Sequence, residues 1–149
     1  AVNSIQWQPY ASSLLSASAD KTISMWDVRS GLCIQTFYGH GNAVNKAKYS
    51  NDGHIIASCD ADGLVKVWDT RMCCEMLQID AGPHPINDLC FDRSGKGITL
   101  ASGDGTVKVF DIGTERACKG TLDGHGDAVL SVALESHGHY MVLAFLFQF

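Results

Sequence analysis

The sequence predicts an all-β protein built from a repeated unit of four short strands, and two observations carry that prediction. One segment occurs three times, as ASADKTISMWD (17–27), ASCDADGLVKVWD (57–69) and ASGDGTVKVFD (101–111). Its aromatic residue stands at Trp26, Trp68 and Phe110, so 42 residues separate each copy from the next. Periods of about 40 to 45 residues that end in a Trp-Asp pair are typical of β-propeller blades. We therefore expect an incomplete propeller with three recognisable four-stranded blades and part of a fourth.

Each repeat contains four strand-like runs separated by Gly, Asn, Asp or Ser. In the first repeat the strands are expected at 2–7, 14–17, 22–26 and 32–37. In the second they are expected at 43–49, 54–58, 64–68 and 73–79, and in the third at 86–91, 97–101, 106–110 and 117–122. No segment has a helical period of useful length. The turn before each third strand carries an aspartate, at Asp20, Asp62 and Asp104.

The fourth repeat begins on schedule at 128–132 and then departs from the pattern, because the chain reads YMVLAFLFQF from residue 140. We assign 1–136 to repeats, as 1–40, 41–82, 83–125 and a partial 126–136, and 137–149 to an atypical hydrophobic tail. Ten residues are too few to span a bilayer, which needs about 20. The tail is either a long or displaced edge strand in an interrupted blade, or the product of truncation, alternative splicing or read-through.

Charge and cysteine content exclude several classes of function. The formal net charge is −5 and the 11 lysines and arginines are scattered, so there is no basic stripe for nucleic acid or an anionic membrane. The six cysteines include no C-x-x-C pair, and no signal peptide is recognisable at the N-terminus. We expect free thiols in a reducing cytoplasm, and neither a nucleic-acid nor a membrane partner.

The second repeat carries the most complete motif. Gly39-His40, SCDADG (58–63) and VKVWD (65–69) together resemble the repeats of the WD40 family. The resemblance implies a buried hydrogen-bonded network of four side chains, which here are His40, Ser58, Asp62 and Trp68.

The other repeats retain less of this network. The first has Ser16, Asp20 and Trp26. The third has Gly82-Pro83 where Gly-His is expected, with Leu100 for the serine and Phe110 for the tryptophan. That blade is expected to depend on apolar packing.

Three residue groups allow a chemical interpretation. Ser58, His40 and Asp62 are the residue types of a hydrolase triad, but there is no G-x-S-x-G elbow, and the aspartate recurs as a turn residue. Residues 58–69 match the spacing of an EF-hand calcium loop, yet strands are expected on both sides. Cys73 and Cys74 with His84 lack the tighter pairing of zinc ligands. We expect no enzyme activity, no catalytic residue, no metal site and no cofactor.

Asn3, Asn45 and Asn87 also recur at intervals of 42 residues, each directly after an apolar residue of the first strand of its repeat. They are expected to form a ring of equivalent positions near the central channel. Two interpretations stay open: hydrogen bonding between neighbouring blades, or a polar ring that contacts a partner peptide.

The function expected from the resemblance is that of a non-catalytic scaffold for protein–protein interaction. IDAGPHPIN (79–87) and FDRSG (91–95) resemble, within the WD40 family, the sperm-associated-antigen type of the axonemal central apparatus. This implies axonemal or microtubule-associated partners in a cilium or flagellum. The alternative is a general cytosolic adaptor in a multiprotein complex. Since a propeller of this family needs about seven blades to close, we also expect self-association or a partner that covers the open blade edges.

Overall fold

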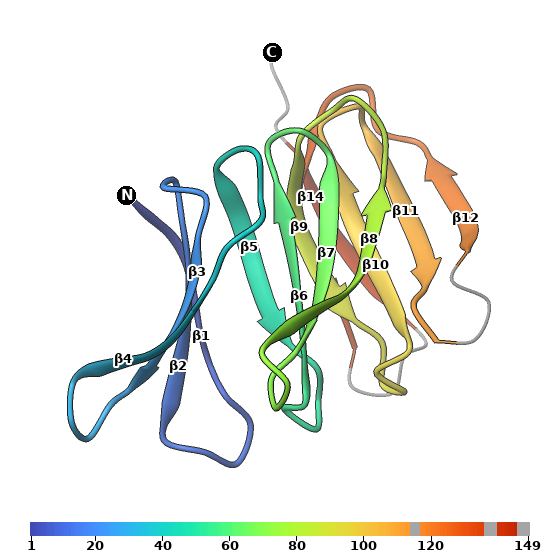
Figure 1. Ribbon diagram of the computed structural model, residues 1–149. Helices are drawn as coiled ribbons and strands as arrows, with labels where there is room; N and C mark the ends of the chain where they lie inside the picture. Colours follow the sequence, from blue (N-terminus) through green and yellow to red (C-terminus); the bar gives the residue numbers. More distant parts are fainter. Residues whose placement is uncertain (114–116, 136–139, 146–149) are drawn as a thin grey trace.

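A computed structural model describes residues 1–113, 117–135 and 140–145. These residues form strands and turns, with no helix among them, and the sheets follow one another from the blue N-terminal end to the red C-terminal end in Figure 1. In the described ranges, accordingly, no helix is long and apolar enough to cross a membrane.

The strands form three four-stranded blades and half of a fourth. The first blade contains β1 (Val2–Trp7), β2 (Ser13–Ser18), β3 (Ile23–Asp27) and β4 (Leu32–Phe37). The second contains β5 (Val44–Tyr49), β6 (Ile55–Asp60), β7 (Leu64–Asp69) and β8 (Cys74–Asp80). The third contains β9 (Ile86–Phe91), β10 (Gly97–Ser102), β11 (Thr106–Asp111) and β12 (Cys118–Asp123). The last sheet contains β13 (Val129–Leu134) and β14 (Met141–Phe145).

Within each blade the strands pair in chain order and antiparallel. The predicted fold class, an all-β and incomplete propeller, is confirmed. The predicted strands agree with the observed ones except for small shifts at their ends. One shift matters for the site, because β6 continues to Asp60 where the sequence predicted an end at Ser58.

The hydrophobic cores lie between blades. Successive residues of a strand point to opposite faces of the sheet, so a middle blade packs on both of its neighbours. Ile56 of β6 is buried with Leu15 and Ile23 of the first blade, whereas the adjacent Ala57 is buried with Leu89 of the third. Each fully buried side chain of the size of Leu or Ile contributes about 1.5 to 3 kcal/mol to stability. The order of the blades is therefore fixed by which face each strand presents.

The first strands β1, β5, β9 and β13 lie next to one another, and a recurrent β-bulge links them. In each complete blade the pairing of the first strand with the second skips one residue, which is Asn3, Asn45 or Asn87. A bulge leaves that residue unpaired in the ladder and turns its side chain aside. Each asparagine Nδ2 donates a 2.8 Å hydrogen bond to a backbone carbonyl of the next blade, that of Val44, Ile86 and Val129 respectively. The asparagine side chains therefore form hydrogen bonds between neighbouring blades, which agrees with the first of the two interpretations given for them.

At one turn the backbone lies too close to a neighbouring connection to leave room for a side chain. Gly63, between β6 and β7, has a φ of 86°, and a Cβ at this position would lie 2.7 Å from the carbonyl oxygen of His84. A side chain there would collide with the connection that leads to the third blade. Lys21, at the equivalent position of the first blade, has a φ of 73°, a conformation that L-residues adopt at a cost of about 1 kcal/mol.

The hydrophobic tail supplies the second strand of the fourth blade. β14 pairs with β13 from Leu134–Met141 to Val129–Phe145, and the pairing skips Leu130, the position equivalent to the bulged asparagines. This register is that of a second strand in the complete blades, so residues 141–145 are not displaced, and they form the edge of a two-stranded sheet in the described part of the fourth blade. Residues 137–139 and 146–149 of the predicted tail lie outside the described residues, and the origin of this segment and the repeat boundaries stay predictions.

The bulge bonds predict a graded loss of stability. Replacing Asn45 with Ala removes one hydrogen bond and leaves the Ile86 carbonyl without that donor, which is expected to lower the free energy of unfolding by about 1 kcal/mol. Asn3→Ala removes the same bond from an exposed residue and should cost less. Urea unfolding of both variants measures the difference, and equal losses would contradict the assigned role of burial.

Candidate functional site

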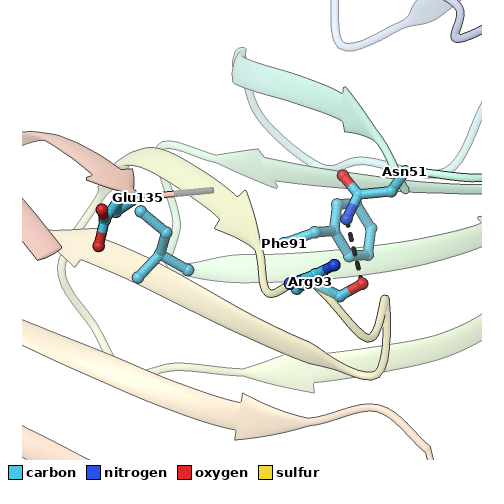
Figure 2. A pocket seen from close by; sticks show the side chains of 5 residues that line it. Asn51, Phe91, Arg93 and Glu135 are labelled. Atoms are coloured by element: carbon cyan, nitrogen blue, oxygen red, sulfur yellow. Dashed lines mark hydrogen bonds between the residues drawn. The ribbon is translucent and has the colours of Figure 1, made fainter. Parts of the chain in front are cut away.

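The described residues include an open pocket and a sealed polar network. The pocket has a volume of about 330 Å³ and is lined by Asn51, Phe91, Arg93, Leu134 and Glu135 (Figure 2). It lies where the turns after the first strands of the second and third blades approach the end of β13. The network lies near the opposite ends of these strands, in the second blade.

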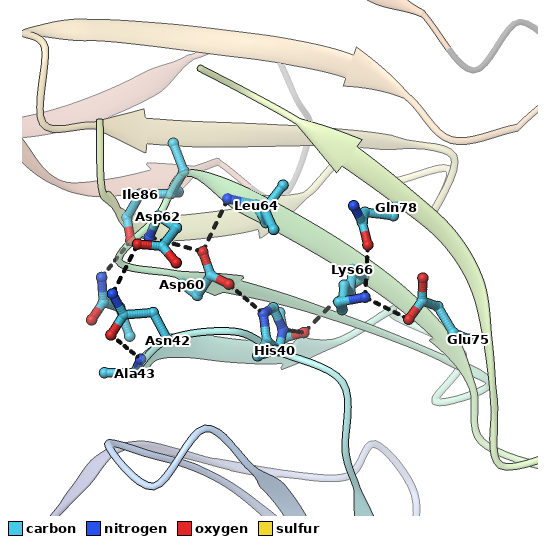
Figure 3. Close-up of polar contacts among 12 residues, drawn as sticks. His40, Asn42, Ala43, Asp60, Asp62, Leu64, Lys66, Glu75, Gln78 and Ile86 are labelled. Carbon is cyan, nitrogen blue, oxygen red and sulfur yellow. Dashed lines mark hydrogen bonds and ion pairs between the residues drawn. The ribbon is translucent and has the colours of Figure 1, made fainter. Parts of the chain in front are cut away.

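The network joins the connection between the first two blades to β6 and β7 (Figure 3). The ring of His40 lies between Asp60 and Ser58, with Nδ1 2.7 Å from Asp60 Oδ2 and Nε2 2.7 Å from Ser58 Oγ. Trp68 Nε1 donates to Ser58 Oγ at 2.9 Å. Ser58 and Asp60 are 0% exposed, Trp68 3% and His40 7%. The four side chains are therefore sealed from solvent.

The carboxylate of this network is Asp60, and the prediction that Asp62 pairs with His40 is wrong. Because β6 continues to residue 60, Asp60 lies two residues after Ser58 and on the same face of the strand. Asp62 lies beyond the strand, is exposed, and accepts a hydrogen bond from Asn42 Nδ2 at 2.8 Å. The two-residue spacing of Ser58 and Asp60 was the signal that could have found the correct residue.

The hydrogen bonds define the protonation of the network. Asp60 Oδ1 accepts the backbone N–H groups of Asp62 and Leu64, each at 3.0 Å, so Oδ2 receives the His40 Nδ1–H. Burial lowers the pKa of His40 and outweighs the opposing effect of the Asp60 carboxylate. The imidazole is thus neutral, and its unprotonated Nε2 accepts the Ser58 hydroxyl. Donors run in one direction, from Trp68 through Ser58 and His40 to Asp60.

Lys66 is a buried member of the same blade that the sequence did not reveal. Its Nζ donates to Glu75 Oε2 at 2.6 Å and to Gln78 Oε1 at 2.8 Å, and lies 5.9 Å from the centre of the Trp68 ring. Two polar partners and an aromatic ring compensate the burial of this charge. Its position two residues before Trp68, on the same strand face, was the available signal.

In the first blade the structure brings together only part of the predicted set. Trp26 Nε1 donates to Ser16 Oγ at 2.8 Å. Asp20 stands apart, where its Oδ1 accepts the backbone N–H and the hydroxyl of Thr22. Ser18 occupies the position equivalent to Asp60. Trp26 is 40% exposed, in contrast to the sealed Trp68.

The third blade has a polar link where the sequence predicted apolar packing alone. Lys108 Nζ donates to the backbone carbonyl of Ala81 and pairs with Asp104 Oδ2 at 3.2 Å. Burial alone would raise the pKa of Asp104, but hydrogen bonds from Thr106 and Ser102 and the contact with Lys108 prevail and lower it. Lys108 thus connects the turn before β11 to the connection that has Gly82-Pro83 in place of Gly-His, so the prediction for this blade is corrected.

The chemical interpretations of the sequence find no accessible site at the predicted residues. Ser58, His40 and Asp60 have the hydrogen-bond order of a hydrolase triad, but Ser58 Oγ is buried and holds the indole N–H, so a substrate carbonyl has no approach.

Residues of the calcium-loop pattern also fail to converge. Both oxygens of Asp60 are engaged inside the blade, and Asp69 lies at the far end of β7, where it accepts the N–H groups of Arg71 and Met72. Cys73 directly precedes β8 and Cys74 is its first residue, whereas His84 lies after its end. The length of the strand therefore separates the two cysteines from the histidine. All six cysteines are free thiols, and burial raises the pKa of Cys90 to about 11.

Antiparallel four-stranded blades whose bulged first strands line up side by side, with a tryptophan held by serine and histidine, define a repeat protein of the β-propeller class. A family model described as "WD domain, G-beta repeat" matches residues 1–27, 31–69, 75–111 and 116–144. The chain therefore belongs to the WD40 repeat family.

Two curated relatives show how local the closer similarity is. WD repeat-containing protein 25 of Mus musculus is 49% identical over 59 residues, which cover 37% of this chain and 11% of that protein. Lissencephaly-1 homolog of Branchiostoma floridae is 61% identical over 31 residues, which cover 21% of this chain and 8% of the relative. The matched region thus spans about a tenth of the length of each relative.

The two aspartates predict different effects on stability. Asp60→Ala leaves the His40 Nδ1–H and two backbone N–H groups without an acceptor inside the blade and is expected to cost about 3 kcal/mol. Asp62→Ala removes one exposed hydrogen bond and should cost below about 1 kcal/mol. Chemical unfolding compares the two variants. If Asp62→Ala proved the more harmful, the assignment of Asp60 would be wrong.

His40 predicts a loss of stability in mildly acidic solution. Because its pKa in the folded protein lies below the ordinary 6.5, the unfolded chain binds a proton more readily. The contribution of neutral His40 to the free energy of unfolding is complete above pH 6.5 and declines as the pH falls below that value. His40→Gln should therefore be less stable than the wild type at pH 7.5 but lose less between pH 7.5 and 5. Urea unfolding at both pH values tests this, with exposed His54→Gln as the control that keeps the wild-type slope.

Proposed function

We propose that this chain is part of a non-catalytic scaffold that binds other proteins. The observation that carries the proposal is the placement of its reactive residue types. Ser58, His40 and Asp60 are sealed inside a blade and hold it together, whereas the turns at the two ends of the blades remain open for contact. Membership of the WD40 family supports the same function.

The particular setting that we propose is cytoskeletal, in the axoneme of a cilium or flagellum. The support is the resemblance of 79–87 and 91–95 to the axonemal type of repeat. Axonemal or microtubule-associated proteins are then the partners, in the cytoplasm. The net charge of −5 and the scattered basic residues speak against nucleic acid and anionic membranes as partners.

A general cytosolic adaptor is the second candidate. Its support is the similarity to WD repeat-containing protein 25, whose name gives the repeat. Both candidates use the same blade surfaces and differ in the partner.

The outer face of the first blade adds a requirement to either candidate. Trp26 is 40% exposed on this face, whereas Trp68, its equivalent in the second blade, is 3% exposed because the first blade covers it. We propose that a further blade covers Trp26, supplied by a longer form of the chain, a second copy or another protein.

Affinity capture distinguishes the two candidates. The tagged protein is incubated with extracts of ciliated and of non-ciliated cells, and bound proteins are identified by mass spectrometry. An axonemal scaffold should recover tubulin or axonemal proteins from the ciliated extract alone. The same partners from both extracts would favour the adaptor, and Asp60→Ala, expected to disturb the second blade, serves as the control for fold-dependent binding. Capture of no protein by the wild type would contradict both candidates.

A further inference from the structure

We propose that the pocket between Asn51, Arg93 and Glu135 binds a short segment of a partner protein, in which an apolar side chain lies between an acidic and a basic one. This inference rests on the proposed function as an interaction scaffold and names the chemistry of one contact. It concerns the end of the blades opposite the sealed network.

The three polar residues lie in the turns that follow the first strands of successive blades. Asn51 and Arg93 are equivalent, whereas Glu135, the first residue after β13, is equivalent to Asp92. The numbers of Asn51 and Arg93 differ by the 42-residue period of the repeat. In Figure 1 the corresponding turns of the second and third blades lie together at the lower end of the sheets.

The residue types at these positions vary from blade to blade, unlike the residues that hold the fold together. Where the blades need one interaction repeatedly, the sequence repeats the residue, as at Asn3, Asn45 and Asn87. At the pocket positions it places a neutral amide, a cation and an anion. Asn51 bonds to the next blade, whereas the side chains of Arg93 and Glu135 form no bond between the described blades and are therefore available for recognition.

The floor of the pocket is apolar and firmly placed. Phe91 packs against the core between the second and third blades, and Leu134 packs against the core between the third and fourth. Both remain only half-buried, so part of each side chain faces the pocket. A volume of about 330 Å³ is at the lower end of the range for ligand sites, with room for one or two side chains.

The polar rim is ordered on one side. Asn51 Nδ2 donates to the backbone carbonyls of Asp92 and Arg93, at 3.3 and 3.2 Å, and so ties the turn of the second blade to that of the third. The backbone of Arg93 is thereby held by the turn of the second blade. A partner then meets a preformed surface, which reduces the entropy lost on binding.

The two charges of the rim are not neutralised by each other. Within the described ranges, neither the Arg93 guanidinium nor the Glu135 carboxylate forms a hydrogen bond or ion pair. Figure 2 shows Glu135 on one side of the pocket and Arg93 with Phe91 on the other. A ligand that complements this arrangement has a carboxylate at Arg93, a cation at Glu135 and an apolar group between them.

A protein segment satisfies this pattern better than other ligand classes. The phosphates of nucleic acid or of a lipid headgroup would be repelled by Glu135, and a metal ion would be repelled by Arg93. A peptide supplies both charges and an apolar side chain within three residues.

Three capped pentapeptides test the proposal: Gly-Asp-Leu-Lys-Gly, Gly-Lys-Leu-Lys-Gly and Gly-Asp-Leu-Asp-Gly. Titration into the isotope-labelled protein is followed by NMR at the Asn51 side-chain amide. The mixed-charge peptide should bind more tightly than either like-charge peptide.

Charge variants of the rim test the proposal more sharply than the comparison of peptides with the wild-type protein. Arg93→Glu makes both sides acidic, so binding of the mixed peptide should weaken by about two- to fivefold and the preferred peptide should become Gly-Lys-Leu-Lys-Gly. Glu135→Lys should shift the preference to Gly-Asp-Leu-Asp-Gly. Arg29→Glu, the same change on an exposed turn of the first blade, is the matched control and should keep the wild-type order.

Two outcomes would overturn the inference: no peptide perturbs the Asn51 amide at millimolar concentration, or Arg93→Glu leaves the order of the peptides unchanged. Either result leaves the scaffold function intact if affinity capture recovers partners as before. Absence of captured proteins with the wild type would instead contradict the scaffold, whatever the peptides show.

Discussion

The contact between His40 and Asp60 is the constraint on which the second blade depends. A carboxylate removed from water is costly unless hydrogen bonds replace the lost hydration. Asp60 receives them from the imidazole and from two backbone N–H groups of the turn that follows. The same interaction therefore fixes the connection from the first blade, the end of β6 and the turn that passes close to the next connection at Gly63.

The three complete blades solve the same structural problem with different side chains. The second uses His40 and Asp60, the third uses Lys108 between a carbonyl and Asp104, and the first has a tryptophan–serine bond without a histidine. Common to all three is the alternation of apolar residues that directs each strand to its neighbours. The polar links thus serve local order, and recognition is better sought at the turns, where the blades differ in charge.

The period of 42 residues was sufficient to predict the fold class, the strands and the equivalence of the three asparagines. It was insufficient for the network, because Asp20, Asp62 and Asp104 share the period while the strand face selects Asp60. Lys66 and Lys108 were missed because their partners lie on other strands or connections. The pocket depends on three turns that come together only in the folded chain, although the 42-residue spacing of Asn51 and Arg93 was present in the sequence.

The bulged asparagines give the array a direction. Each one reaches a carbonyl 41 or 42 residues later in the chain, so every blade offers a donor to the blade that is synthesised after it. Contacts between blades join sequence neighbours, as in repeat arrays whose folding spreads from unit to unit. Order can therefore spread along the chain from any folded blade to its neighbours.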